Sequence, residues 1–402
     1  MPAWSPSSWL HYTDQQTVDY PDGAALARVI LQLNQLPPLV TRTEINRLKK
    51  AIACAGRGEA FILQGGDCAE SFQDCRIEII HNKLKILLQM SHVLHRSMKK
   101  PIIPVGRIAG QYAKARSSDV ETINGVTLPS YRGDLINSPP FNTDAREPNP
   151  HLLLQGYRCA SKTLSILRSL LTQKALKKGH HVDFFTSHEA LHLHYEQALT
   201  RYDKPSGLWY NLSTHLPWIG MRTAHLDSAH LEFLRGVENP IGIKIGPHAT
   251  PEWISALVER LNPKREEGRI LLISRMGATN IRALLPPLIE EVKTLHIPVT
   301  WSCDPMHGNT EITGNGTKTR HFDNIFLELQ QALCIHRELG SHLGGVHFEL
   351  TGENVTECIG GARGLTETDL SHAYHSLVDP RLNYEQSLEM AMQLSQQFSA
   401  QP

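Results

Sequence analysis

Three side chains of the kinds that bind transition metals lie within or shortly after short apolar stretches. Cys68 and His307 each follow such a stretch by a few residues, and Glu349 lies inside one. A carboxylate within an apolar run needs a partner, because an unpaired buried carboxylate is costly. Thiolate, imidazole and carboxylate together favour a first-row ion such as Mn, Co, Fe or Zn over Mg or Ca. No zinc-finger spacing joins the three residues, so only the fold could assemble a metal site from them.

Positively charged side chains gather at similar places along the chain. Arginine binds phosphate and carboxylate oxygens through a planar fork, whereas lysine acts as a point charge. Taken singly, each is an ordinary surface or ion-paired residue; as a converging set they predict a pocket for two anionic groups, such as two phosphorylated substrates. The set comprises Arg107, Lys114, Arg116, Arg222, Lys244 and Arg275.

Eight short apolar or β-branched runs alternate with stretches of helical period, and these are the elements that must position the reactive residues. Alternation of this kind is typical of βαβ units around a parallel sheet, and eight strands favour a closed (β/α)₈ TIM barrel over a doubly wound open sheet. In a barrel all the strand ends would meet at one face, where such enzymes place their active sites. The predicted strands are Ala60–Gln64, Ile102–Val105, Val182–Thr186, Leu208–Leu212, Ile241–Ile245, Ile270–Ser274, Ile297–Ser302 and Gly345–Leu350.

The chain ahead of the first strand has helical patterns and turn signals but no strand candidate. We therefore predict an N-terminal helical extension over residues 1–58, a plausible oligomer contact, and a catalytic barrel over residues 59–402. The segments Ser117–Pro150 and Thr172–His181 are predicted to be extra loop elements outside the barrel.

Composition narrows the class of protein. Lys plus Arg and Asp plus Glu both number 40, so the formal net charge is zero, which argues against bulk attraction to nucleic acid or to an acidic membrane. The seven cysteines are scattered without CxxC spacing, which favours a reducing compartment. We see no signal peptide and no apolar run of the roughly 20 residues that a membrane helix needs. A cytoplasmic protein is expected.

Ten motifs are distributed along nearly the whole chain: QGGDCAESF, GRIAGQYAKARS, YRGDLIN, TSHEAL, WIGMRT, NPIGIKIGP, SRMGA, CDPMHGNT, HFELTGENVTEC and DPRLN. Together they closely resemble the class II 3-deoxy-D-arabino-heptulosonate 7-phosphate (DAHP) synthase family. That family condenses phosphoenolpyruvate with erythrose 4-phosphate, the first step of the shikimate pathway to chorismate and the aromatic amino acids.

The resemblance implies roles for particular residues. It gives metal ligands at Cys68, His307, Glu349 and, from the comparison alone, Asp379, with manganese or cobalt as the expected ion and zinc or iron as alternatives. It implies phosphoenolpyruvate binding by Arg107, Arg222, Lys244 and Arg275. It assigns the aldose phosphate to the segment Lys114-Ala115-Arg116-Ser117, which matches the family's KPRS, so Arg116 and Ser117 join the substrate residues. Lys114 and Lys244 are the expected catalytic residues, with Lys114 protonating the new alkoxide. A homo-oligomer and, as in some family members, a chorismate mutase partner are expected; nucleic acid and membrane are not.

Three residues depart from the family pattern. Met221 and Ala224 stand where the family's WIGERTR has Glu and the final Arg, and Ala115 replaces the proline of KPRS. A thioether accepts hydrogen bonds far more weakly than a carboxylate. Met221 lies on the substrate side, which leaves room for a related synthase that uses an amino-substituted aldose phosphate. A non-catalytic metabolite-binding homologue is the third alternative, although the complete ligand set counts against it.

Overall fold

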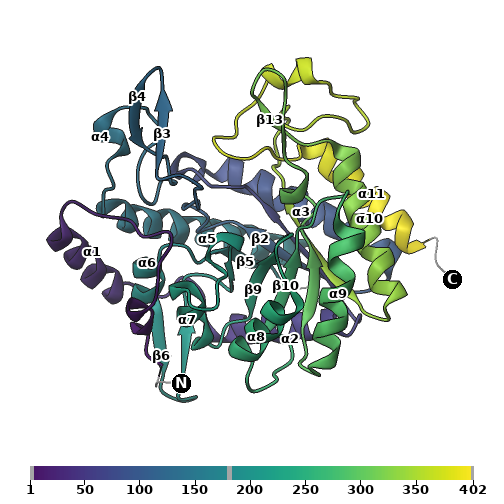
Figure 1. Cartoon of the computed structure of the whole chain (residues 1–402), viewed down its shortest axis with the longest axis horizontal. Coiled ribbons are helices and arrows are strands. Elements are labelled where there is room, and N and C mark those ends of the chain that lie inside the picture. Colours follow the sequence, from purple (N-terminus) through teal and green to yellow (C-terminus); the bar gives the residue numbers. More distant parts are fainter. Residues whose placement is uncertain (1–3, 179–182, 400–402) are drawn as a thin grey trace.

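Eight parallel strands form a closed barrel at the centre of the molecule (Figure 1). The computed structural model describes residues 4–178 and 183–399. Around the barrel the strand order is β1-β14-β11-β10-β9-β8-β5-β2, and every neighbouring pair is parallel. The predicted (β/α)₈ barrel is confirmed. The strands are β1 (Phe61–Gly66), β2 (Ile102–Arg107), β5 (Phe185–Glu189), β8 (Leu216–Ile219), β9 (Ile241–Ile245), β10 (Ile270–Ser274), β11 (Thr300–Cys303) and β14 (Leu343–Glu349).

A helix follows each barrel strand and lies on the outside of the barrel. In the helix Pro251–Leu261, Ile254, Leu257, Val258 and Leu261 recur at helical spacing and are buried, while Thr250 caps the first turn. Such an apolar stripe packs the helix against the barrel, while the opposite face of the helix stays in water. The helices are α3 (Ile77–Met98), α5 (His151–Lys178), α6 (Leu193–Ala198), α7 (Ala229–Arg235), α8 (Pro251–Leu261), α9 (Ile281–Thr294), α10 (Phe322–Glu338) and α11 (Tyr384–Ser399).

The fourth predicted strand was wrong. The run Leu208–Leu212 contains β7 (Leu208–Asn211), which pairs antiparallel with β6 (Thr200–Asp203) in a hairpin outside the barrel. The fourth barrel strand is β8, whose four residues are all buried. Both runs are short and apolar, so pattern alone could not decide between them; pairing with β5 and β9 does. The third predicted strand begins at a residue outside the described part of the chain, and β5 starts at Phe185.

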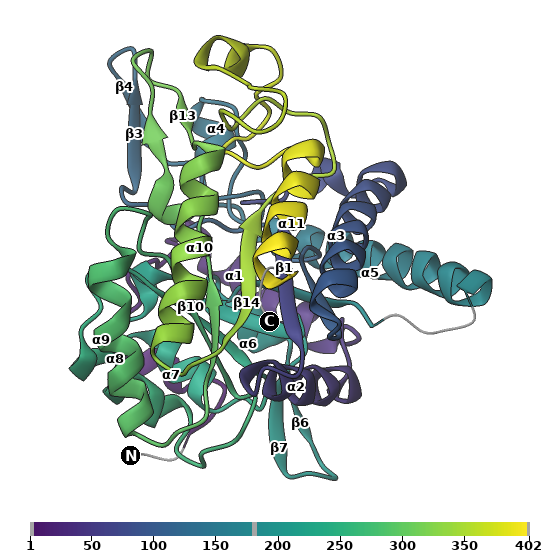
Figure 2. The same cartoon turned by 90° about the vertical axis from the view of Figure 1, so that its right-hand side faces the viewer.

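The N-terminal chain closes the bottom of the barrel. It contains α1 (Gly23–Gln35) and α2 (Arg42–Gly56), the latter begun by a capping box between Thr41 and Glu44. In α2, Leu48, Ile52 and Ala55 are fully buried in one cluster with barrel-interior residues that include Ile62, Val105 and Ile273. Figure 2 shows α2 at the end of the barrel opposite the hairpin of β3 (Val120–Ile123) and β4 (Val126–Pro129). Residues of the predicted N-terminal extension therefore complete the barrel core, and its boundary near residue 58 stays a prediction.

Truncating Ile52 tests this packing. We expect Ile52→Ala to lower the free energy of unfolding by about 2–5 kcal/mol, because the lost methylenes leave a cavity between α2 and the barrel floor. The measurement is chemical denaturation. Ile77→Ala is the control, since Ile77 is 57% exposed and its truncation should cost no more than about 0.5 kcal/mol. Equal losses of stability in the two variants would contradict the packing of α2 against the bottom of the barrel.

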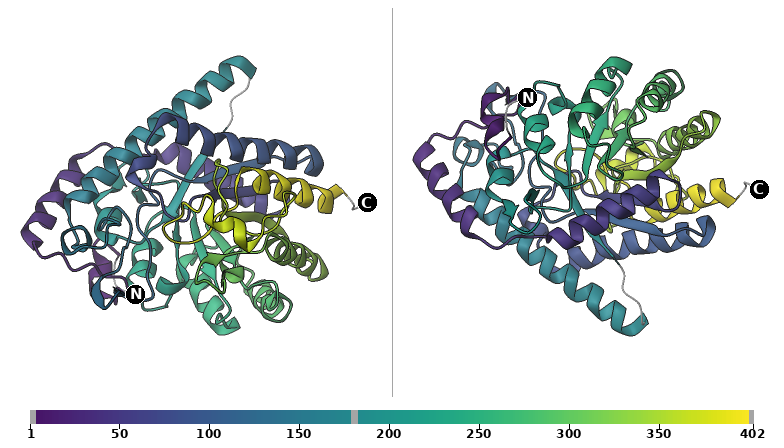
Figure 3. Two further views of the ribbon diagram at one scale, coloured as in Figure 1. Left: turned by 90° about the horizontal axis from the view of Figure 1, so that it is seen from above. Right: turned by 90° about the horizontal axis from the view of Figure 1, so that it is seen from below.

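Extra elements stand above the opposite end of the barrel, where the strands end. Two hairpins rise on either side of it: β3 (Val120–Ile123) with β4 (Val126–Pro129), and β12 (Glu311–Ile312) with β13 (Lys318–Thr319) (Figure 1). Seen from above, α5 extends well past the ring of helices (Figure 3). The short helix α4 (Thr143–Arg146) belongs to the same excursion as β3 and β4. No helix among the described residues is long and apolar enough to cross a membrane.

Candidate metal centre and substrate pocket

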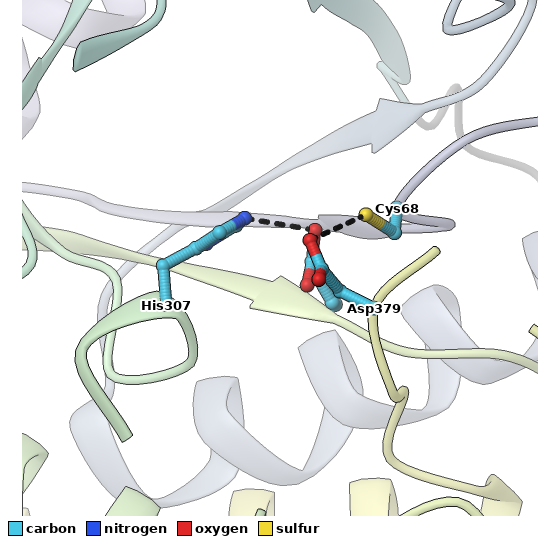
Figure 4. A group of neighbouring side chains, drawn as sticks. Cys68, His307 and Asp379 are labelled. Carbon is cyan, nitrogen blue, oxygen red and sulfur yellow. Dashed lines mark hydrogen bonds and ion pairs between the residues drawn. The ribbon is translucent and has the colours of Figure 1, made fainter. Parts of the chain in front are cut away.

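Four side chains that lie far apart in the sequence converge above the barrel. Cys68 follows β1, His307 follows β11, Glu349 ends β14, and Asp379 lies in the loop before α11. One ligand atom from each falls within 4.8 Å of the others. The Cys68 thiol donates to Asp379 at 3.3 Å, and His307 Nε2 lies 3.1 Å from Glu349 Oε1. Figure 4 shows Cys68, His307 and Asp379 pointing toward one another. The barrel thus assembles the predicted ligand set.

The Glu349 carboxylate is the part of this cluster that most needs a cation. It is fully buried, and burial opposes its charge, but His307, Arg320 and Arg107 hold its pKa well below the usual range. Arg320 Nη1 lies 2.7 Å from Oε2 and Arg107 Nη2 lies 3.1 Å from Oε1. These contacts are close enough for charge attraction, yet within the described chain no well-aligned hydrogen bond reaches either oxygen. Buried carboxylate lone pairs without aligned donors fit a metal ion, and so does the mixed sulfur, nitrogen and oxygen donor set.

Lys114 contacts two other members of the cluster, Cys68 and Asp379. Its Nζ is 2.7 Å from Cys68 Sγ and 2.8 Å from Asp379 Oδ2. Burial raises the pKa of the Cys68 thiol well above its usual range, with Glu349 adding to the shift and Lys114 opposing it. Burial also opposes the charge on Asp379, but Lys114 and other cations keep its pKa low. A metal ion would have to displace the thiol proton, so metal affinity should rise with pH.

Asp304 fixes the orientation of His307. Its Oδ2 lies 2.7 Å from His307 Nδ1, while Oδ1 accepts the backbone N–H groups of Met306 and His307 at 3.0 and 3.2 Å. A carboxylate on one imidazole nitrogen sets the tautomer and turns the other nitrogen toward the ligand position. Asp304 also pairs with Lys244, so a single buried carboxylate joins the ligand His307 to a cation of the pocket.

A cavity of about 200 Å³ opens beside the candidate metal ligands, and Cys68, His307 and Asp379 line it. It brings together most of the predicted anion-binding residues. Arg275 donates to the His307 carbonyl at 2.7 Å, and Arg107 donates to the Cys68 carbonyl at 3.1 Å, so both guanidinium groups are tied to ligand-bearing loops. The lining is Cys68, Arg107, Gln111, Lys114, Ala115, Glu189, Trp218, Gly220, Met221, Arg222, Lys244, Arg275, His307, Thr310 and Asp379.

Two predicted substrate residues do not line this cavity. The Arg116 guanidinium turns toward the β3–β4 hairpin and pairs with Glu121 at 3.4 Å, and Ser117 is exposed. Both residues lie on the segment that carries Lys114, but this segment leaves the cavity after Ala115. Their roles in binding the aldose phosphate stay predictions.

Several residues of the site were not among the predicted ones. Gln111, Glu189 and Trp218 line the cavity and lie at or just beyond strand ends, a position that could have identified them. Arg320, fully buried against Glu349, sits between β13 and α10, where no strand pattern points to it.

Two of the three departures from the family pattern, Met221 and Ala224, lie together, while Ala115 lines the main cavity. The Met221 thioether lies 3.7 Å from Arg275 Nη1, a weak contact where a carboxylate would make a strong one. Met221 and Lys244 also line a second, mostly apolar cavity of about 320 Å³ that includes Ala224 and Trp253. Met221 and Ala224 therefore leave apolar space beside the polar pocket.

Comparison with known proteins extends along the whole chain. The profile of the class-II DAHP synthetase family matches residues 4–178 and 171–395. A Neurospora crassa protein named phospho-2-dehydro-3-deoxyheptonate aldolase is 42% identical, over 99% of this chain and 95% of its own length. A Streptomyces coelicolor protein of the same name is also 42% identical, over 98% of this chain and 97% of its own.

A solved structure supports the fold. The phospho-2-dehydro-3-deoxyheptonate aldolase of Francisella tularensis superposes with a TM-score of 0.56 at 14% identity, covering 97% of this chain and all of that one. At this identity the likeness establishes the barrel architecture alone. With the profile match and two relatives at 42% identity, the chain belongs to the class-II DAHP synthetase family.

Proposed function

We propose that this protein condenses phosphoenolpyruvate with erythrose 4-phosphate to form DAHP and phosphate, the first step of the shikimate pathway. The observation that carries the proposal is a cation-lined cavity directly beside a four-residue metal site. Family membership supports the same reaction. The two alternatives, an amino-substituted aldose phosphate as acceptor and a non-catalytic homologue, gain no support from the relatives.

Cys68, His307, Glu349 and Asp379 would hold the divalent ion, with manganese or cobalt as the proposed metal and zinc or iron as alternatives. When bound, such an ion supplies Lewis-acid polarisation of a carbonyl oxygen. Arg320 and Arg107 would keep Glu349 ionised for that role, and Asp304 would keep the His307 ring turned toward the ion.

The surrounding cations would bind and orient the two substrates. Arg107, Arg222, Lys244 and Arg275 are proposed to hold phosphoenolpyruvate, and their charges reduce the repulsion between two phosphorylated molecules. Lys114 contacts Cys68 and Asp379 and is proposed to give a proton to the oxygen that becomes an alkoxide. A homo-oligomer, a chorismate mutase partner and a cytoplasmic location stay predictions.

Phosphate release tests the reaction. Purified protein given both substrates should release phosphate, lose that activity on chelation, and regain it when Mn²⁺ or Co²⁺ is added back. Omitting erythrose 4-phosphate provides the control, because phosphate release without the aldose would indicate a phosphatase. Bound metal without any turnover would favour the non-catalytic homologue. Turnover only with an amino-substituted aldose phosphate would favour that acceptor.

The pH profile should carry the signature of Lys244. Burial lowers the pKa of this lysine to about 8, with Arg107 adding to the shift and Asp304 opposing it. An amine is charged below its pKa, so kcat/KM for phosphoenolpyruvate should fall as pH rises through about 8. Steady-state kinetics from pH 6 to pH 10 checks this. In Lys244→Arg the guanidinium stays charged, and the alkaline fall should move upward; an unmoved fall would assign it to another group.

A further inference from the structure

The loop after β1 and the loop after β2 are joined through the carboxylate of Glu70. Glu70 is buried, and its two oxygens accept three successive backbone N–H groups: Ala109 at 3.1 Å, Gly110 at 3.0 Å and Gln111 at 2.9 Å. In the opposite direction, the Glu70 N–H donates to the Gln111 carbonyl at 2.7 Å. Four hydrogen bonds thus hold two short loops in one fixed relation.

The backbone of the second loop is bent to make this contact. Ala109 has φ +65°, a left-handed conformation that non-glycine residues rarely adopt. Such a conformation turns consecutive N–H groups to one side and creates a nest for an anion. An alanine persists there only when its surroundings compensate for the strain, and the Glu70 carboxylate provides that compensation.

The two joined loops carry Cys68 and Lys114, the two side chains whose relative position matters most for the proposed reaction. Cys68 lies two residues before Glu70, and Lys114 lies three residues after Gln111; their Sγ and Nζ atoms are 2.7 Å apart. Arg107 stands at the start of the second loop and donates to the Cys68 carbonyl. Gln111 extends the connection to the next strand, because its side-chain oxygen accepts the Glu189 N–H at 2.8 Å.

We propose that Glu70 is a positioning residue: through the Ala109–Gln111 nest it sets the distance between the metal ligand Cys68 and the proton-donating Lys114. Glu70 does not line the substrate cavity, so its effect passes through these two side chains. The inference rests on the proposed function, since it assigns the fixed distance to the step in which Lys114 delivers a proton.

Glu70→Gln is the principal test. Glutamine has the same shape, but only its single oxygen can accept hydrogen bonds, and its NH₂ group would face backbone donors. We expect kcat to fall by about 100-fold, as for a catalytic group misplaced by roughly 1 Å, with the KM for phosphoenolpyruvate changed by less than about threefold. In Co²⁺-loaded protein the thiolate-to-cobalt absorption of Cys68 should shift or weaken, a readout that does not depend on turnover.

Glu232→Gln is the matched control. Glu232 is equally buried, but it pairs with Arg235 and Arg260 on the outside of the barrel. That variant should lose stability while keeping its kcat and cobalt spectrum. If Glu70→Gln behaves in the same way, Glu70 only supports the fold and the proposal is overturned. Should Glu70→Gln fail to fold, Glu70→Asp keeps the charge but withdraws it by one methylene, and the same loss of kcat and spectral change are expected. An inactive wild type would refute the proposed function, while the cobalt spectra would still test whether Glu70 positions Cys68.

Discussion

Replacing Cys68 with alanine should yield a folded protein that retains little metal and whose kcat/KM is lower by about 10³-fold or more. Lewis-acid stabilisation contributes several kcal/mol, and each 1.36 kcal/mol corresponds to a factor of ten in rate. Cys68 is one of the four proposed ligand donors, and its loss removes the thiol from a cluster in which Asp379 also pairs with Lys114 and Lys318. Metal content after dialysis, circular dichroism and phosphate-release kinetics measure the effect.

Cys334→Ala is the control for this variant, because Cys334 is a partly exposed cysteine on α10 outside the ligand cluster. It should keep full metal content and rate. Retention of both properties by Cys68→Ala would refute the metal assignment. Loss of metal with a normal rate would instead refute a role for the metal in the reaction.

Replacing Lys244 with methionine should have the second largest effect. The two side chains have similar length, so the change removes the charge while much of the packing remains. Lys244 is buried in the cavity wall and paired with Asp304, so the variant loses a cation proposed to bind phosphoenolpyruvate and leaves a buried carboxylate with fewer partners. We expect kcat/KM to fall by about 10²–10³-fold. Stability should fall as well, by at most the 3–5 kcal/mol typical of broken buried pairs, since Asp304 keeps its bonds to His307 and Met306.

A second substitution separates these two losses. Adding Asp304→Asn to Lys244→Met removes the uncompensated charge, so thermal stability should partly recover while activity stays low. The solvent-exposed Lys264 provides the matched control, because its partners Glu238 and Glu266 do not line the substrate cavity and also pair with Lys49. An equal kinetic loss in Lys264→Met would point to net charge, and unchanged kinetics in Lys244→Met would remove this lysine from the binding site.

Much of the barrel was predictable because each element carries its own pattern. The strands Ile241–Ile245 and Ile270–Ser274 match the prediction residue for residue, and the helix Pro251–Leu261 lies between them. Their apolar runs are bounded by turns, and the helix has both a cap and a proline at its start. By contrast, Leu208–Leu212 has the same local character as a barrel strand. Only the competition with Leu216–Ile219 for the neighbours β5 and β9 decides between them, and that is a tertiary effect.

The candidate site likewise contains residues that the local sequence predicts and residues that only tertiary contacts determine. Cys68, His307 and Glu349 could be anticipated because each stands at a strand end, and parallel strand ends meet at one face. Asp379 lies on a long loop, and its position depends on contacts with Lys114 and Lys318 that no local pattern encodes. Arg320 was missed for the same reason. The nest that holds Glu70 depends on the φ of Ala109, a residue type that gives no hint of a left-handed conformation.

The packing of α2 against the bottom of the barrel also has a consequence for how the protein folds on the ribosome. The helix emerges early, yet its apolar side, with Leu48, Ile52 and Ala55, fits against a floor that is complete only when β14 pairs with β1 and β11. At roughly 5–20 residues per second, the interval before β14 emerges lasts on the order of tens of seconds. During that time the nascent chain exposes an apolar surface that nothing covers. Chaperones that bind ribosome-bound intermediates should therefore bind mainly at α2, and this binding should end when the last barrel strand is released.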